Sequence, residues 1–141
     1  MAALVSLITL GVRDLRRATA FYEAVGFERS SVSVDGVVTF FRSEGPVLAL
    51  WSSAELADDA GVSADGSGFR HCSFAMNLHS EEELQDVYDA FVAAGATPMK
   101  PVHEVFFGAS SYVADLDGHV WELAYNRDFP FRLDGRLDLP A

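Results

Sequence analysis

The sequence of 141 residues contains one cysteine, Cys72, and this scarcity limits how the chain can be stabilised. A lone thiol cannot form an intramolecular disulfide, so a core must hold the fold, and a reducing compartment is the default expectation. Half of the residues are hydrophobic and 12% are aromatic, which is enough to build a substantial core. We therefore expect one ordinary domain, or two small half-domains that share a core.

Basic residues are also scarce: 10 Lys and Arg stand against 21 Asp and Glu, which gives a formal net charge of −11. Nucleic acids and anionic membranes are bound by basic patches, so the balance argues against both as partners. An acidic chain is compatible with a cationic or aromatic small molecule as its ligand.

Long apolar runs are missing as well. The start, "MAALVSLITLGVRDL", is apolar but too short to span a membrane, and no basic residue precedes its apolar part. We interpret this segment as the first strand of a cytoplasmic protein.

What the sequence does contain is an internal repeat. Residues 7–27 predict a strand followed by a helix that ends at Gly26, and residues 71–96 have the same pattern, with Ser80 and Glu83 as a capping-box pair. The two strand starts are 64 residues apart. Each half then continues with apolar runs around a turn, at Gly45 in the first half and at Gly118 in the second, and matching these glycines places Ala49 opposite Glu122.

This repeat predicts an α+β fold of two paired βαβββ modules that form a curved mixed sheet with a cleft, within one domain spanning residues 1–141. The expected bounds are 4–52 for the first module, 53–68 for a linker, 69–126 for the second module and 127–141 for a C-terminal tail. Neither half-sheet can bury both of its faces alone, so the halves are expected to pair.

One carboxylate, Glu122, interrupts the apolar strand after Gly118. Because strand residues alternate between faces, Trp121 and Leu123 are expected under the helix and Glu122 inside the curved sheet. The same alternation in "HCSFAMN" places His71 on the face of Ser73 and predicts that Cys72 is a buried core residue. His71 and Glu122 would then point into one cleft, either as ligands of a divalent metal or as an acid/base pair.

Other residues are candidates for the cleft wall or rim. Phe106, Phe107 and Tyr112 either stack on a flat ligand or simply pack, and Trp51 follows Ala49 at a strand end. The remaining histidines, His79, His103 and His119, are expected to be solvated loop residues. The full set of expected ligand-binding residues is Leu7, Thr9, Ala49, Trp51, Ser73, Phe106, Phe107 and Tyr112.

Three segments carry a resemblance to a known family: "VRDLRRATAFYEAVGF", "FFG" at 106–108 and "VADLDGHVWEL" at 113–123. In this order they resemble the vicinal oxygen chelate superfamily, which includes glyoxalase I, bleomycin-resistance proteins and extradiol dioxygenases. In glyoxalase-like members, four ligands from the first and fourth strands of each half hold a metal. The resemblance places Leu7, Ala49, His71 and Glu122 at these positions, and it implies a homodimer whose clefts take residues from both chains.

Leu7 and Ala49 cannot bind a metal, so the metal set of His71 and Glu122 is incomplete. Our first hypothesis is therefore a protein that binds a small organic molecule without a cofactor, with sequestration or resistance as its role. The alternative is a metal-dependent lyase, isomerase or dioxygenase in which His71 and Glu122 hold a divalent metal, or in which Glu122 acts as a general base. A third hypothesis is a non-catalytic dimeric interaction module.

Overall fold

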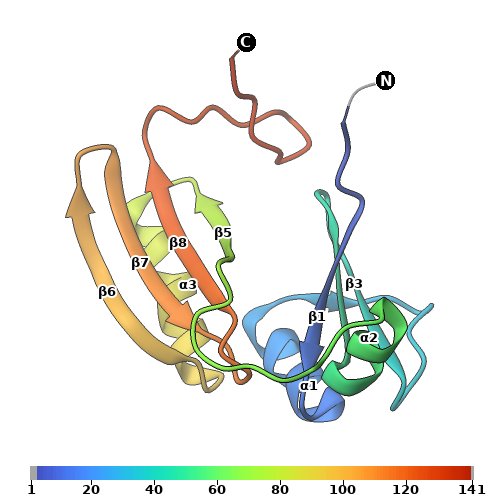
Figure 1. Cartoon of the computed structure of the whole chain (residues 1–141). Helices are drawn as coiled ribbons and strands as arrows, with labels where there is room; N and C mark the ends of the chain where they lie inside the picture. Colours follow the sequence, from blue (N-terminus) through green and yellow to red (C-terminus); the bar gives the residue numbers. More distant parts are fainter. Residues whose placement is uncertain (1–2, 141) are drawn as a thin grey trace. The chain divides into compact units, whose positions relative to one another are not determined.

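A computed structural model describes residues 3–140, and the chain divides into two compact units, with the boundary between Ser67 and Gly68. Each unit contains a four-stranded mixed sheet (Figure 1). We call residues up to 67 unit 1 and those from 68 onward unit 2. The predicted α+β class and the two βαβββ modules are confirmed.

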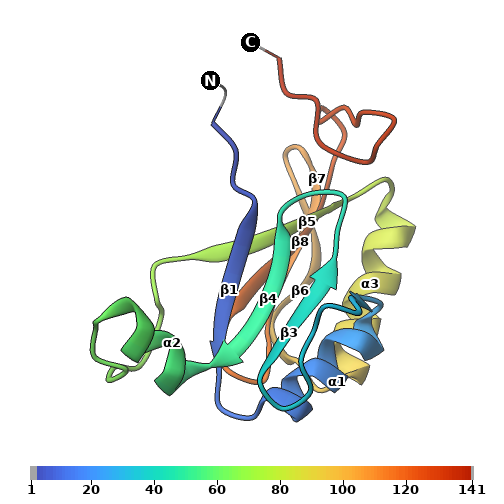
Figure 2. The same ribbon diagram turned by 90° about the vertical axis from the view of Figure 1, so that its right-hand side faces the viewer.

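Unit 1 has its two parallel strands at one edge of the sheet, with strand order β1-β4-β3-β2. β1 and β4 run parallel, whereas β3 is antiparallel to both β4 and β2. Figure 2 shows β4 between β1 and β3. The elements of unit 1 are β1 (Leu7–Val12), α1 (Leu15–Val25), β2 (Glu28–Arg29), β3 (Val38–Arg42), β4 (Val47–Ser52) and α2 (Ser53–Ala60).

α1 begins and ends where local chemistry predicts. The side chain of Asp14 accepts a hydrogen bond from the Arg17 amide at 3.0 Å and so satisfies one of the free amides of the first turn. Gly26 ends the helix in the left-handed conformation, with φ of 116°, as predicted. The buried Tyr22 packs its ring against Phe27 and Phe41, so the core of unit 1 lies between α1 and one face of its sheet.

The segment 53–68, expected to be a linker, begins with the helix α2, which takes up its first eight residues. This helix starts against β1, where a side chain on Gly11 would come within 2.9 Å of the Ser53 hydroxyl. Glycine at this position therefore allows the close approach. Within the described residues, no helix is long and apolar enough to cross a membrane.

Unit 2 repeats the connectivity of unit 1, with strand order β5-β8-β7-β6. β5 runs parallel to β8, and the remaining neighbours are antiparallel. The elements are β5 (Ser73–Leu78), α3 (Glu81–Ala93), β6 (Thr97–Val105), β7 (Gly108–Ala114) and β8 (Val120–Asn126).

The predicted capping pair starts α3. The Ser80 hydroxyl accepts from the Glu83 amide at 3.0 Å, and the Glu83 carboxylate accepts from the His79 amide at 2.7 Å. Leu84 and Phe91 are fully buried, and the ring of Phe91 lies 5.9 Å from that of Trp121 on β8. α3 therefore covers the face of the sheet that carries Trp121.

Two expectations for the start of unit 2 are wrong. Cys72 is exposed rather than buried, and the strand begins at Ser73 instead of His71. The physical reason is the backbone of His71, whose φ of 59° is left-handed and breaks the alternation of faces. Residues 71 and 72 consequently have no register partner in β8.

Candidate functional site

Each sheet has one face packed on a helix, α1 in unit 1 and α3 in unit 2, and a second face that points away from it. We call this second face the helix-distal face. In unit 2, Trp121 and Leu123 are buried on the α3 side, so Glu122 between them lies on the helix-distal face, as predicted.

Two side chains of β7 hold Glu122. The Tyr112 hydroxyl donates to Glu122 Oε2 at 3.0 Å, and the Ser110 hydroxyl donates to the same oxygen at 3.2 Å. Tyr112 is the register partner of Glu122, and the strand period of two puts Ser110 on the same face. Ser110 is buried, while Tyr112 and Glu122 are half-buried. Both hydrogen bonds go to Oε2, and none is made to Oε1 within residues 3–140.

The environment fixes the protonation state of Tyr112. Its hydrogen bond to Glu122 raises the pKa of the phenol above the usual 10.0, and burial and the nearby negative charge act in the same direction. Tyr112 therefore remains a hydrogen-bond donor throughout the physiological range. The sequence left open whether this ring stacks on a ligand or packs, and its contact with Glu122 was not anticipated.

His103 was expected to be a solvated loop residue, but it lies in β6, half-buried and in register with Ser110. Cross-strand partners share a face, so His103 belongs to the helix-distal face that carries Glu122. Its Nδ1 lies 2.8 Å from the Pro101 carbonyl oxygen. The sequence did not predict this strand because it contains Pro98 and Pro101, and proline within a segment indicates an edge strand or a loop. β6 is indeed the edge strand, and its pairing has two register shifts nearby.

The structure places His71 apart from the strand that pairs with Glu122. The residue paired with Glu122 across β5 and β8 is Ala75, and the aromatic partner of the His71 ring is Phe69, at 5.4 Å. Within residues 3–140, no hydrogen bond joins His71 to Glu122. A direct role for His71 in the site therefore stays a prediction.

The strand registers also correct the repeat. Leu7 pairs with Val47 in unit 1, and Ser73 pairs with Val120 in unit 2. Since Val47 and Val120 are 73 residues apart, as predicted for this strand, Ser73 is the counterpart of Leu7. The N-cap residues, Asp14 and Ser80, show the same offset of 66 residues rather than 64. The earlier match of His71 to Leu7 is therefore wrong.

The helix-distal face of unit 1 has the opposite character. Its residues on β1 and β4 that were expected to bind a ligand are Leu7, Thr9, Ala49 and Trp51. Ala49 is buried, Thr9 and Trp51 are half-buried, and Leu7 is exposed. Phe40 pairs with Ala49 and adds a ring to this face. On β1 and β4 this face is thus mostly apolar, and Arg42 of β3 forms an exposed ion pair on it with its register partner Glu28 of β2. The face of unit 2 instead carries a carboxylate with ordered donors.

With the corrected register, the resemblance to glyoxalase-like proteins places Leu7, Ala49, Ser73 and Glu122 at the four metal-holding positions. One carboxylate does not make a metal site. In the described part of the chain, no group of three or more His, Cys, Asp and Glu side chains could hold a metal ion. The residues present do not fit the metal of this fold family.

Phe106 and Phe107 lie at the turn between β6 and β7 and form an edge-to-face pair with centroids 5.2 Å apart. Phe106 is 93% exposed, so its ring does not pack into the unit. The Arg127 guanidinium donates to the Phe106 carbonyl at 2.7 Å and fixes the turn to the segment after β8. Their contact with a ligand remains a prediction.

Comparison with solved structures gives close matches to this architecture. A glyoxalase-related enzyme from Fulvimarina pelagi is 34% identical, with a TM-score of 0.86 over 99% of this chain and 100% of the other. A glyoxalase/bleomycin resistance protein/dioxygenase family enzyme from Burkholderia phytofirmans PsJN is 20% identical, with a TM-score of 0.76 over 88% and 99% of the two chains.

A lactoylglutathione lyase from Agrobacterium tumefaciens is 22% identical, with a TM-score of 0.66 over 88% of this chain and 94% of the other, and this likeness shows the fold alone. No curated protein matches the chain. The family model of the Glyoxalase/Bleomycin resistance protein/Dioxygenase superfamily matches residues 4–123. By this match, the fold and the 34% identical relative, the chain belongs to the glyoxalase/bleomycin resistance protein/dioxygenase superfamily.

Proposed function

We propose that this protein binds a small organic molecule on the helix-distal face of unit 2, with Glu122 as the polar anchor. The observation that carries the proposal is the pair of hydrogen bonds from Tyr112 and Ser110 to Oε2. They fix the orientation of the carboxylate before any ligand arrives, which lowers the entropy cost of binding. A residue kept only by inheritance would not need two ordered donors.

The chemistry of this anchor favours a ligand that donates a hydrogen bond or carries a positive charge. Tyr112 stays protonated, and Oε1 accepts from the ligand. The net charge of −11 on the whole chain also attracts cations. An aromatic or aliphatic body beside the donor group would add apolar contact area to the complex. The role that fits such binding is sequestration, and with it resistance to a toxic compound.

A second candidate is an enzyme that uses Glu122 as a general base on a carbon next to a carbonyl. The observation that favours it is His103, a second proton-transfer group on the same face as the carboxylate. The description of the 34% identical relative as an enzyme supports it. Because the metal positions do not fit a metal, we derive no step through one. A site completed by His71 and a divalent ion is an outcome for the experiment to exclude.

The experiment compares four proteins: wild type, Glu122→Gln, Tyr112→Phe and the control Glu104→Gln. Glu104 is an exposed carboxylate on β6 whose register partner is Ala109, so it lies on the opposite face of the same sheet. A panel of aromatic amines, other cationic compounds and neutral aromatics is screened by shifts in melting temperature.

We expect at least one amine to stabilise wild type and the control, with a loss of about tenfold or more in affinity for Glu122→Gln, because a charge-assisted hydrogen bond disappears. Elemental analysis of untagged protein purified without chelator runs in parallel. One metal per chain that disappears in His71→Ala would sink the metal-free proposal. Equal binding to Glu122→Gln would remove Glu122 as the anchor. The absence of any shift across the panel would favour a non-catalytic dimeric module.

A further inference from the structure

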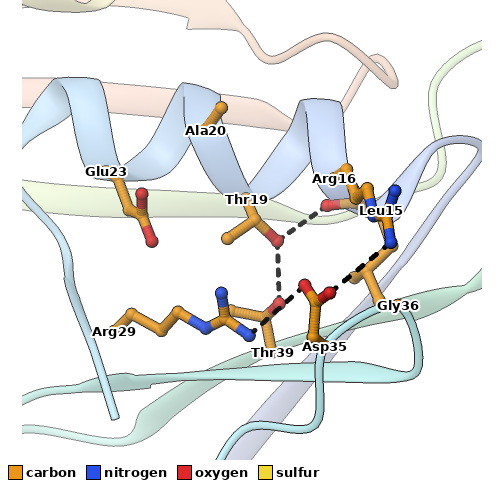
Figure 3. Close-up of a pocket in the computed structure, with 9 residues that line it drawn as sticks. All are labelled: Leu15, Arg16, Thr19, Ala20, Glu23, Arg29, Asp35, Gly36 and Thr39. Atoms are coloured by element: carbon orange, nitrogen blue, oxygen red, sulfur yellow. Dashed lines mark hydrogen bonds and ion pairs between the residues drawn. The ribbon is translucent and has the colours of Figure 1, made fainter. Parts of the chain in front are cut away.

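Unit 1 contains a pocket of about 210 Å³ on the helix side of its sheet (Figure 3). Its polar lining comes from α1, from β2, from the loop that follows it and from β3. Thr39 on β3 pairs with Leu50 of the core, so it points toward α1 and away from the face of Ala49. The pocket is therefore separate from the residues that form the helix-distal face. Its polar residues are Arg16, Thr19, Glu23, Arg29, Asp35 and Thr39.

Two buried hydroxyls form the floor of the pocket, 2.7 Å apart. Thr19 also donates to the Leu15 carbonyl at 2.7 Å, and a hydroxyl has a single proton to give. Thr39 is consequently the donor in the contact between the two threonines. Its oxygen keeps a lone pair for a further donor, so the floor presents an acceptor to whatever enters the pocket.

The rim combines both signs of charge. The Asp35 carboxylate lies 3.5 Å from the Arg16 guanidinium and 3.9 Å from that of Arg29, both of which are long ion pairs. Arg29 extends along the pocket toward Asp35, and Glu23 lies at the other end (Figure 3). Two guanidinium groups and two carboxylates thus surround a floor that accepts hydrogen bonds.

We propose that this pocket binds a small amino carboxylate, a molecule that carries an ammonium and a carboxylate a few bonds apart, such as a free amino acid. The ligand carboxylate binds the Arg29 guanidinium, whose planar group matches carboxylate geometry and whose ion pair with Asp35 is long, at 3.9 Å. The ammonium donates to Thr39 Oγ1 and is attracted by Glu23.

Charge and size select this class over simpler ligands. A plain anion would be repelled by Glu23, by Asp35 and by the net charge of −11, whereas a plain cation would meet the two arginines. Ligand sites for drug-sized molecules span roughly 300–1,000 Å³, so a pocket of about 210 Å³ suits a smaller metabolite.

The test uses isothermal titration calorimetry on the full chain with the L-amino acids one at a time. Each amino acid that binds is compared with the carboxylate that lacks its ammonium and with the amine that lacks its carboxylate. We expect saturable binding of at least one amino acid, and binding at least tenfold weaker for each matched half. No binding across the amino acids, or equal binding of a half molecule, would overturn the proposal.

Variants locate the binding. Arg29→Gln and Thr39→Val are expected to lower the affinity for the amino acid tenfold or more. Thr39→Ser, which keeps the hydroxyl, is expected to bind it with the affinity of wild type. Arg42→Gln is the matched control, because Arg42 forms an exposed ion pair with Glu28 and does not line the pocket. If Thr39→Val fails to fold, Arg29→Gln decides alone, and undiminished binding there overturns the assignment. Glu122→Gln leaves this binding unchanged, so the outcome is independent of the proposed function.

Discussion

At the scale of single residues, the structure shows how one carboxylate acquires defined chemistry from its neighbours. Glu122 alone was visible in the sequence as an odd residue in an apolar strand. Its two donors, Tyr112 and Ser110, are ten and twelve residues away in the chain. They come together because β7 and β8 are antiparallel neighbours with Tyr112 directly opposite Glu122.

The raised pKa of Tyr112 gives a prediction for alkaline pH. Its pKa in the folded protein lies above the usual 10.0, so the stability that its protonated form contributes is complete below pH 10 and is lost as pH rises through the higher folded value. A spectrophotometric titration of tyrosinate in wild type minus Tyr112→Phe should show a late-titrating phenol. In Glu122→Gln that phenol should titrate earlier, and an unchanged midpoint would contradict the assigned cause.

At the scale of elements, the helix boundaries depend on a few polar contacts. Ser80 caps α3, the helix whose buried face packs on Trp121. We expect Ser80→Ala to lower the free energy of unfolding by about 1 kcal/mol, because an amide of the first turn loses its partner. Urea denaturation followed by circular dichroism measures this. Ser80→Asp, which retains a capping oxygen, should remain close to wild type, and a loss equal to that of alanine would argue against capping.

Much of the element order could be predicted, because alternation, helical periodicity and Gly26 are local signals. The start of β5 could not, because few residues other than glycine adopt a left-handed backbone, and nothing local in the sequence shows that His71 is one of them. This error had three consequences. The predicted repeat was shifted by two residues, His71 instead of Ser73 was matched to Leu7, and Cys72 was predicted to be buried. The sequence predicted Glu122 on the polar face of unit 2 but not His103, because the prolines of β6 made this segment look like a loop.

At the scale of the whole molecule, the two units share connectivity but differ in chemistry. The helix-distal face of unit 1 is mostly apolar on β1 and β4, and that of unit 2 carries Glu122 with its donors. Exact repetition of a unit would have given both faces the same residues. The shared connectivity therefore carries a hydrogen-bonded carboxylate in one unit and mostly apolar side chains at the matching strands of the other.

Family membership leads us to predict a homodimer. Two chains that each carry a charge of −11 repel one another, and salt screens this repulsion. Light scattering should therefore report twice the mass of one chain at moderate salt, with a larger monomer fraction at low salt. A monomer at every salt concentration would contradict the prediction.

The sharing of Oε2 by two donors has a consequence for ligand shape. A guanidinium or amidinium binds a carboxylate through two parallel bonds, one to each oxygen. In Glu122, Oε2 already accepts hydrogen bonds from Tyr112 and Ser110, which use both of its lone pairs. A planar group therefore cannot form its second parallel hydrogen bond to this carboxylate. An ammonium needs a single oxygen and meets no such obstacle. Under the proposed function, Glu122 would therefore bind ammonium groups in preference to planar guanidinium or amidinium groups.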